Sequence, residues 1–293
     1  MRAPIWLDLD GAVNARDLGG LPTVDGRTTR PGVLLRADNL QDLSARDVDR
    51  LVGELGVRTV VDLRSTGEVH LAGPTPLAGS AVRHVQLSLI PEWDGEPDVD
   101  EVERAVEQAV VNEHDEPQAL DAATTEKALP SLSDFEERAR QRRDPTDLAD
   151  HYIGYVEAAR TNLGTALKVL ADPQSGTTLV HCAAGKDRTG VVVALALSLV
   201  GVPRDAVLAD YLRSAERADR ILARLQSTDV YGPSLAGVSV DDITPRAASM
   251  EGFLDHVDTA YGGPHGMALA LGVTEEEIAR LGVRLLGTSP SVR

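Results

Sequence analysis

The 293-residue chain has one cysteine, Cys182, and no long apolar run. A single cysteine excludes an intramolecular disulfide, suits a reducing compartment and leaves the thiol without an internal partner that could resolve an oxidised form. The longest apolar run, Val191 to Val200, is too short to cross a bilayer, and no apolar stretch of signal-peptide length follows Met1. We therefore expect a cytoplasmic protein without stable membrane insertion, and export without a leader stays compatible with the sequence.

Basic residues are also scarce. The chain has 29 Lys and Arg against 46 Asp and Glu, a formal net charge of −17, which disfavours nucleic acid and anionic membrane surfaces as partners. No metal-ligand spacing of His or Cys occurs, so we expect no metal and no cofactor. No long Pro-, Gly- or Ser-rich linker divides the chain, and 42% hydrophobic residues can build one substantial core. The composition predicts one domain over residues 1–293 and gives no oligomeric state.

What the chain does have is one dense motif, the segment 181–190, which reads His-Cys-Ala-Ala-Gly-Lys-Asp-Arg-Thr-Gly. The apolar run 177–180 precedes it and the apolar run 191–197 follows it, which is typical of a strand, a tight loop and a buried helix. Cys182 and Arg188 are separated by five residues. This spacing can place a thiolate and a guanidinium at opposite sides of one phosphate-sized bowl.

The residue types of this motif suit phosphate-ester hydrolysis. A helix N-terminus and neighbouring cations favour the reactive thiolate, and inward-turned amides bind an anion without side chains. Arg188 offers two parallel hydrogen bonds to phosphoryl oxygens, and Thr189 can donate to the sulfur of Cys182, which would attack phosphorus and form a phosphocysteine. His181 is expected to orient the loop from behind. The predicted phosphate-binding residues are Ala183, Ala184, Gly185, Lys186, Asp187 and Arg188.

Two other interpretations of this motif fit the sequence less well. A Walker A loop would need glycine at Val180 and Ser or Thr at Asp187, so it fails at two defining positions. Cys182 could instead be an inert core residue, because cysteine is often buried. The strand before the motif and the helix after it favour the catalytic interpretation.

The motif, together with Asn14–Gly20 and Asp62–Ser65, resembles the bacterial atypical protein-tyrosine and phosphoinositide phosphatases. Weaker likeness runs through Ala209–Ser214 and Tyr261–Gly263, so the resemblance spans nearly the whole chain except about 92–150. It implies a dual-specificity-phosphatase-like fold and metal-free hydrolysis through phosphocysteine. The implied substrates include phosphotyrosine, phosphoserine or phosphothreonine, and phosphoinositides.

The hydropathy pattern predicts an α/β fold. It indicates a central mixed sheet flanked by helices, a helical lid insertion at about 92–150 and a helical C-terminal third. Expected strands cover 32–36, 57–62, 81–87 and 177–181, the last of them central. Expected helices run from a cap at Ser44 to Leu55, from a cap at Thr146 to Leu170, and from starts at Pro203, Thr244 and Thr274.

The insertion is acidic at first and then charged and helical. One interpretation is a solvated surface element; the other is a lid that shields Cys182 and presents arginines to an anionic substrate. Those arginines are Arg138, Arg140, Arg142 and Arg143.

The general acid is left open by the sequence, because the Trp-Pro-Asp tripeptide common in tyrosine phosphatases is absent. Asp187 inside the loop and Asp94 after the third strand rank together as candidates, with Glu92 behind them, and each could instead be an ordinary surface or loop-stabilising acid.

Further residues are expected to support the loop without touching substrate: Asn14, Arg16 and Asp17 near the N-terminus, and Asp62 and Arg64 after the second strand. Tyr211 and Arg213 are expected to contribute to helix packing.

The motif and the resemblance together predict a phosphomonoesterase that acts on a phosphorylated substrate. The alternatives are a phosphatase of a small phosphorylated metabolite, such as a sugar, a nucleotide or a biosynthetic intermediate, and, more remotely, a non-catalytic phosphate-binding module.

Overall fold

The structure is a computed structural model that describes residues 5–90 and 145–287. Most of the expected insertion at 92–150 lies outside these residues, as do Asp94, Glu92 and the four arginines from Arg138 to Arg143. Residues 145–150 form the start of a helix.

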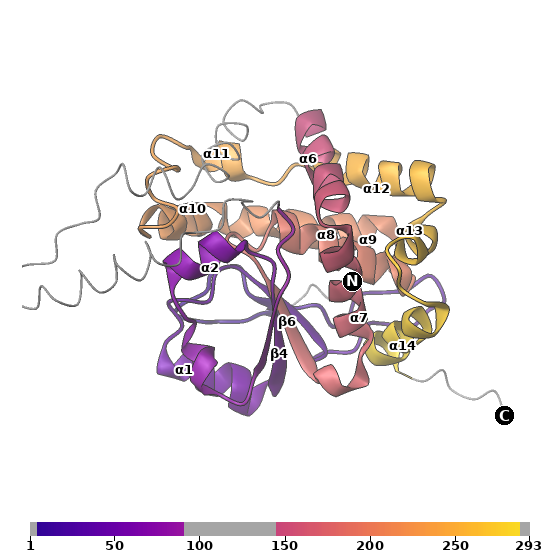
Figure 1. The fold of residues 1–293 in the computed structure, drawn as a ribbon, viewed down its shortest axis with the longest axis horizontal. Helices are drawn as coiled ribbons and strands as arrows, with labels where there is room; N and C mark the ends of the chain where they lie inside the picture. Colours follow the sequence, from indigo (N-terminus) through magenta and orange to yellow (C-terminus); the bar gives the residue numbers. More distant parts are fainter. Residues whose placement is uncertain (1–4, 91–144, 288–293) are drawn as a thin grey trace, which may run out of the picture.

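The centre of the fold is a six-stranded sheet in the order β1-β2-β3-β6-β4-β5 (Figure 1). Strands β3, β6, β4 and β5 run parallel to one another, and β1 and β2 add an antiparallel edge. The sheet is thus mixed, as expected. The strands are β1 (Ile5–Trp6), β2 (Arg16–Asp17), β3 (Leu34–Ala37), β4 (Val57–Asp62), β5 (Arg83–Gln86) and β6 (Thr177–His181).

Alternate residues of the central strands face two different cores. Leu34, Val61 and Val180 pack with the helices that follow the insertion. Their neighbours Leu35, Val60 and Leu179, which are paired in register, pack on the opposite face with the N-terminal helices. Both faces of the sheet are therefore covered, which explains why β6 reads as a continuous apolar run.

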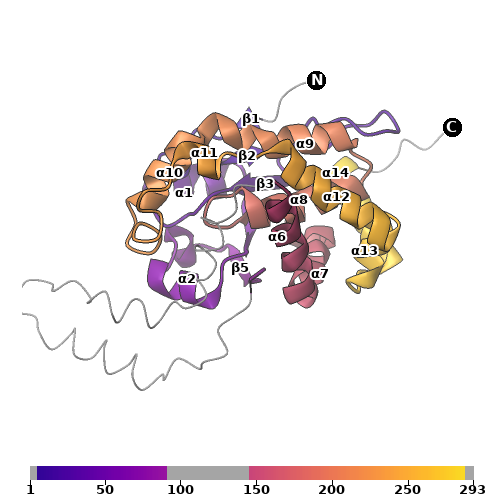
Figure 2. The ribbon, with the colours of Figure 1, turned by 90° about the horizontal axis from the view of Figure 1, so that it is seen from above.

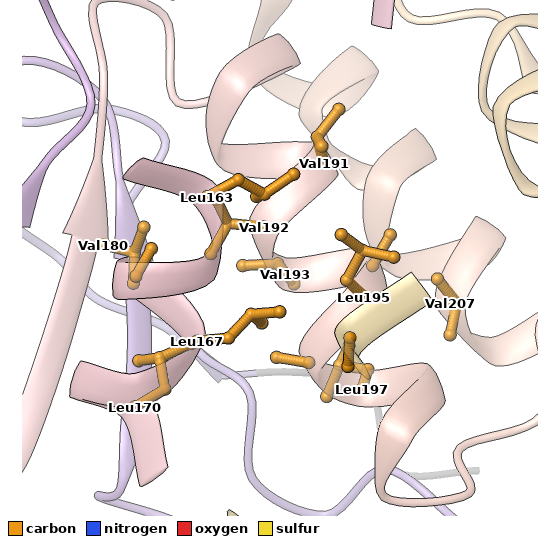
Figure 3. Close-up of a cluster of buried hydrophobic side chains, with 14 of the residues drawn as sticks. Leu163, Leu167, Leu170, Val180, Val191, Val192, Val193, Leu195, Leu197 and Val207 are labelled. Atoms are coloured by element: carbon orange, nitrogen blue, oxygen red, sulfur yellow. The ribbon is translucent and has the colours of Figure 1, made fainter. Parts of the chain in front are cut away.

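Helix α8 (Asp187–Leu199) is buried along most of its length. Figure 3 shows its valines and leucines beside Leu163, Leu167 and Leu170 of α7 (Arg160–Ala171) and Val180 of β6. This packing fixes the start of α8, and with it the end of the motif loop, against the sheet.

The N-terminal face carries α1 (Ala45–Val48), which continues into a π-helical segment, η1 (Asp49–Glu54), and α2 (Thr66–Ala72). Ser44 caps α1 as expected. Short 3-10 segments cover Pro76–Gly79, Pro173–Ser175 and Arg213–Arg217.

The helix expected from Thr146 to Leu170 is in fact two helices. Helix α6 (Pro145–Ala158) begins one residue before Thr146, with proline at the position that tolerates it. Helix α7 (Arg160–Ala171) follows after Ala159, whose backbone leaves the helical region at φ −130° and ψ 36°. The two halves have different partners, because α6 packs mainly on α12 (Ala247–Tyr261) and α7 packs on α14 (Glu275–Leu286) and α8.

The C-terminal third is helical, as expected, and its helices are seen from above in Figure 2. Pro203 precedes α9 and Thr274 caps α14, but Thr244 starts no helix. Pro245 holds Thr244 in an extended conformation, so the next helix begins at Ala247. The helices are α9 (Arg204–Leu212), α10 (Ala218–Gln226), α11 (Val240–Ile243), α12 (Ala247–Tyr261), α13 (Pro264–Ala270) and α14 (Glu275–Leu286). Across the described parts of the chain, no helix combines the length and apolar character needed to cross a bilayer.

Candidate active site

The motif loop joins the carboxyl end of central strand β6 to the N-terminus of α8. Cys182 follows the strand directly and is 2% exposed. Lys186 stands at the N-cap of α8 and makes no side-chain capping bond, so no capping side chain occupies the N–H groups at the helix start. The loop therefore places a thiol beside a helix end that attracts anions.

Gly185 is required by the shape of this loop. Its φ is +64°, in the left-handed region, and a Cβ at this position would lie 2.4 Å from the carbonyl oxygen of Ala37. The loop thus presses against the end of β3 at a distance that only glycine permits.

Three successive carbonyl groups of the loop are bound from outside. Because a trans peptide unit directs its C=O and the following N–H in opposite directions, outward carbonyls turn the amides of Ala184, Gly185 and Lys186 inward. Those amides donate to no other described residue, so they are available to an anion. The carbonyl of Ala183 accepts from the Asn39 amide at 2.9 Å, that of Ala184 from Asn14 Nδ2 at 2.9 Å, and that of Gly185 from Arg36 Nη2 at 2.6 Å.

A buried charge cluster supports these contacts. The Asp210 carboxylate accepts from Arg16 Nε at 2.8 Å and from Arg36 Nη1 at 2.6 Å, and Arg16 Nη1 donates to Asn14 Oδ1 at 2.7 Å. Burial, followed by the neighbouring charge of Arg36, lowers the pKa of Arg16 to about 10. Burial opposes ionisation of Asp210, but the two arginines outweigh it and hold the pKa of that carboxyl below its usual range.

Arg188 is held from behind by Glu68 of α2. Its Nη1 and Nη2 donate to the two carboxylate oxygens of Glu68 at 2.5 and 2.8 Å, and Nη1 also donates to the carbonyl of Leu63 at 3.3 Å. A guanidinium has five N–H donors, so Nε–H and the second Nη2 hydrogen remain. These two lie on one edge and are parallel, which is the geometry that binds two phosphoryl oxygens.

Glu68 itself is fixed on all sides. It has no exposed surface, it accepts from the Ser65 amide at 2.8 Å as part of a capping box, and Tyr231 donates its hydroxyl to it at 3.1 Å. Burial opposes its ionisation, but Arg188 outweighs burial and lowers the pKa of Glu68. Sequence reasoning missed this residue, although the Ser-x-x-Glu signature after Arg64 could have marked it.

Asp62, Arg64 and His181 form a third buried group. Arg64 Nε donates to Asp62 Oδ1 at 2.9 Å and Nη2 to Oδ2 at 2.6 Å, while His181 Nε2 lies 3.5 Å from Asp62 Oδ2. His181 Nδ1 faces the carbonyl of Cys182 at 3.3 Å, which requires the proton on Nδ1. Burial lowers the pKa of His181 to about 4, so the ring is neutral at pH 7.

Lys186 and Asp187, at the start of α8, have partners that the sequence did not predict. Lys186 Nζ donates to the carbonyl of Ile243 at 2.7 Å and lies 3.5 Å from Asp187 Oδ1. Asp187 Oδ1 accepts from the Tyr152 hydroxyl at 2.6 Å. The hydroxyl of Thr189 is buried and bonds to none of the described residues, so its expected hydrogen bond to the Cys182 sulfur is absent here.

Two expected positions, Asp17 and Arg213, lie differently from the prediction. Asp17 does not reach the loop, because its carboxylate accepts from the amides of Gly19 at 2.9 Å and Gly32 at 2.7 Å. Arg213 lies over the Trp6 ring at 5.1 Å. Tyr211 packs in the core as expected, and its hydroxyl also lies 2.8 Å from that of Tyr152.

The fold and the motif loop together define the class of enzyme to which this chain belongs. A buried cysteine after a central parallel strand, inward amides and an arginine with one free hydrogen-bonding edge are the parts of a cysteine-dependent phosphatase. Comparison with known proteins agrees: a model of the tyrosine phosphatase family matches residues 7–287, and the chain belongs to that family.

Two relatives show the extent of the similarity. The triple specificity protein phosphatase PtpB of Mycobacterium tuberculosis is 30% identical over 298 residues, covering 96% of this chain and 99% of its own. A tyrosine-protein phosphatase of Nostoc commune is 30% identical over 149 residues, covering 48% of this chain and 50% of its own. The chain is thus a phosphoric monoester hydrolase of the cysteine-dependent type.

Proposed function

We propose that Cys182 and Arg188 carry this hydrolysis through a phosphocysteine intermediate. The Cys182 thiolate attacks phosphorus, a P–S bond forms and the P–O ester bond breaks, and the leaving oxygen takes up a proton. Water then attacks the phosphocysteine, the P–S bond breaks, and inorganic phosphate leaves with the thiolate restored.

One observation supports this proposal most directly. The inward amides and the free edge of Arg188 belong to the same loop as the buried Cys182, and Cys182 lies close enough to Arg188 to help raise the pKa of the guanidinium, so an anion bound by these donors would lie near the thiol. Donors arranged before the substrate arrives stabilise the charge that develops in the transition state without a cost of reorientation.

Asp187 is our proposed proton-exchanging group, and Asp94 stays an alternative outside the described residues. Burial opposes ionisation of Asp187, but Lys186 and the Tyr152 hydroxyl outweigh it and lower the pKa of that carboxyl. The ionised form suits the second step, in which the carboxylate accepts a proton from the attacking water. A bound phosphate dianion beside Asp187 raises its proton affinity, which suits proton donation to the leaving group in the first step.

Phosphoproteins are the proposed substrates, with phosphotyrosine first and phosphoserine or phosphothreonine after it. The name of the mycobacterial relative, a triple specificity protein phosphatase, supports a broad protein specificity. Phosphoinositides are less favoured, because the Lys186 ammonium that would hold a second phosphate is bound to the carbonyl of Ile243. We also propose that residues 1–293 act as one domain in the cytoplasm.

Rapid-quench mass spectrometry tests the assignment of the nucleophile. With para-nitrophenyl phosphate, we expect a transient phosphoryl group on the peptide that contains Cys182, together with a burst of nitrophenol. Cys182→Ser should bind inorganic phosphate but lose turnover and the burst, because a serine hydroxyl is a far weaker nucleophile at neutral pH. Turnover of Cys182→Ser at more than a few per cent of the parental rate would refute the proposal. A parallel screen with phosphopeptides, phosphoinositides and small phosphate esters then ranks the substrate classes.

A further inference from the structure

Asp187 is tied to the protein by a chain of two buried tyrosines. Tyr152 of α6 donates its hydroxyl to Asp187 Oδ1 at 2.6 Å, and the Tyr211 hydroxyl of α9 lies 2.8 Å from that of Tyr152. Tyr152 has no exposed surface and Tyr211 is 1% exposed. Helices α6 and α9 therefore meet at one carboxylate, at the first residue of α8.

The direction of these hydrogen bonds follows from counting protons. An ionised carboxylate only accepts, so the single hydrogen of Tyr152 is committed to Asp187. Tyr211 must then donate to the Tyr152 oxygen, because that oxygen has no second hydrogen to give. Two donors in series polarise each other and strengthen the bond to the carboxylate.

Packing holds both rings in this geometry. Tyr152 stacks on Tyr155 with ring centroids 6.0 Å apart and meets Phe253 edge-on at 6.4 Å. The Tyr211 ring lies against Gly190, the last residue of the motif, where an added Cβ would stand 3.2 Å from its Cδ2 atom. The glycine that ends the motif thus leaves room for the second tyrosine.

We propose that Tyr152 is a positioning residue for catalysis: its hydroxyl, oriented by Tyr211, sets the charge and the orientation of Asp187. This inference rests on the proposed role of Asp187 in proton exchange. Tyr152 would not touch the substrate; it would act only through the carboxylate that it holds.

Other groups also face this carboxylate and must be separated from the effect of Tyr152. Burial favours the neutral form of Asp187, while neighbouring cations and the tyrosine hydroxyl favour the ionised form and together lower its pKa. Burial raises the pKa of Tyr152 well above its usual range, so the hydroxyl stays protonated and able to donate at all pH values of interest. The facing groups are Lys186 at the N-cap of α8, Arg188 on α8, His151 and Tyr155 on α6, and Tyr211 on α9 with Arg36 of β3 behind it.

The test is the titration of Asp187 in Tyr152→Phe, which keeps the ring and removes only the hydroxyl. Loss of one hydrogen bond to a charged carboxylate raises its pKa, so we expect the midpoint to move up by about one pH unit. The midpoint is read directly by NMR of 13C-labelled aspartate in the Cys182→Ser background, where no turnover is needed, with Asp187→Asn to assign the signal. In the active enzyme, the limb of the kcat profile that disappears in Asp187→Asn should move by the same amount.

Two further variants grade the effect. Tyr211→Phe keeps the bond to Asp187 but removes its support, so it should shift the midpoint in the same direction and by less. Tyr261→Phe removes a distant hydroxyl bonded to Arg160 and should leave the midpoint unchanged. The proposal is overturned if Tyr152→Phe folds with a parental melting temperature but leaves the Asp187 midpoint in place. It is equally overturned if Tyr211→Phe shifts that midpoint more than Tyr152→Phe does. Because the NMR titration needs no catalysis, failure of the proposed function would be seen separately, as a phosphate-binding protein without turnover.

Discussion

At the scale of the residue, buried arginines do most of the positioning in this site. Arg16, Arg36 and Arg64 have no exposed surface, and each has a carboxylate partner within 2.9 Å. A buried charge without a partner is strongly destabilising, so each pair must persist for the fold to persist. The guanidinium also brings several donors in one plane, which lets Arg36 pair with Asp210 and hold the loop carbonyl of Gly185 at the same time.

The proposed contact of Arg188 with the phosphoryl group uses the same property, and this gives a prediction for Arg188→Lys. Lysine keeps the charge but cannot contact both oxygens of Glu68 and two phosphoryl oxygens at once. We expect kcat/KM to fall by at least about 100-fold, the scale of losing one positioned donor to a transition state. Steady-state kinetics with para-nitrophenyl phosphate measures it, and Arg280→Lys on the surface of α14 serves as the control. A lysine variant with near-parental kcat/KM would show that the free edge of Arg188 does not bind the phosphoryl group.

At the scale of the element, the strands were predicted best where burial is continuous. The runs 57–62 and 177–181 are β4 and β6 to the residue, because apolar runs bounded by turn residues leave little choice of register. Strand β3 begins two residues later than expected, and β5 is shorter than the expected strand at both ends. The two-residue strands β1 and β2 were missed, since two residues carry no periodicity.

The sequence predicted helix ends wrongly where neighbouring helices pack on different parts of the fold. No local signal marks the break at Ala159, because α6 and α7 form one amphipathic pattern and separate only through the helices they pack on. Thr244 shows a different limit: it looks like a cap, but the proline that follows it keeps its backbone extended.

The loop between β6 and α8 depends on the conformation of one glycine, which Gly185→Ala tests. An alanine there meets the carbonyl of Ala37 and adopts a left-handed conformation that costs at least about 1 kcal/mol. We expect lower stability to urea and a loss of phosphate binding, because the inward amides depend on this turn. Gly154→Ala within α6, where a Cβ meets nothing within 4 Å, should instead stabilise the protein by about 0.5–1 kcal/mol. If Gly185→Ala binds phosphate as the parent does, the amide cradle is wrongly assigned.

At the scale of the whole molecule, the site is assembled from segments that the sequence does not connect. The motif alone was enough to propose Cys182 as the nucleophile and Arg188 as its phosphate-binding partner, because both residues lie within it. Glu68, Arg36, Asp210 and Tyr152 become visible only when four other elements converge on the loop. Sequence reasoning could therefore propose reactive groups but not the residues that hold them, and it did not predict that the Lys186 ammonium bonds to the carbonyl of Ile243.

The same convergence buries a neutral histidine behind the loop, and this makes folding stability depend on pH. The pKa of His181 is about 4 in the folded protein, because of burial, against roughly 6.5 in an unfolded chain. Between these values the unfolded state binds more protons, so stability is full above pH 6.5 and falls as pH decreases toward 4. The shift corresponds to about 3 kcal/mol of unfolding free energy, and most of this is lost above pH 4. Paired carboxylates such as Asp62, whose pKa is about 2, affect stability only at lower pH.

Urea unfolding from pH 7.5 to 4.5 measures this dependence, and His181→Asn separates the histidine from every other group. The asparagine amide can still donate to the carbonyl of Cys182 but does not titrate. The parent should lose about 1.4 kcal/mol of unfolding free energy for each pH unit between about 6 and 5, while the variant stays nearly flat over that interval. Parallel slopes in the two proteins would mean that His181 is protonated in the folded state, and the neutral ring behind the loop would have to be abandoned.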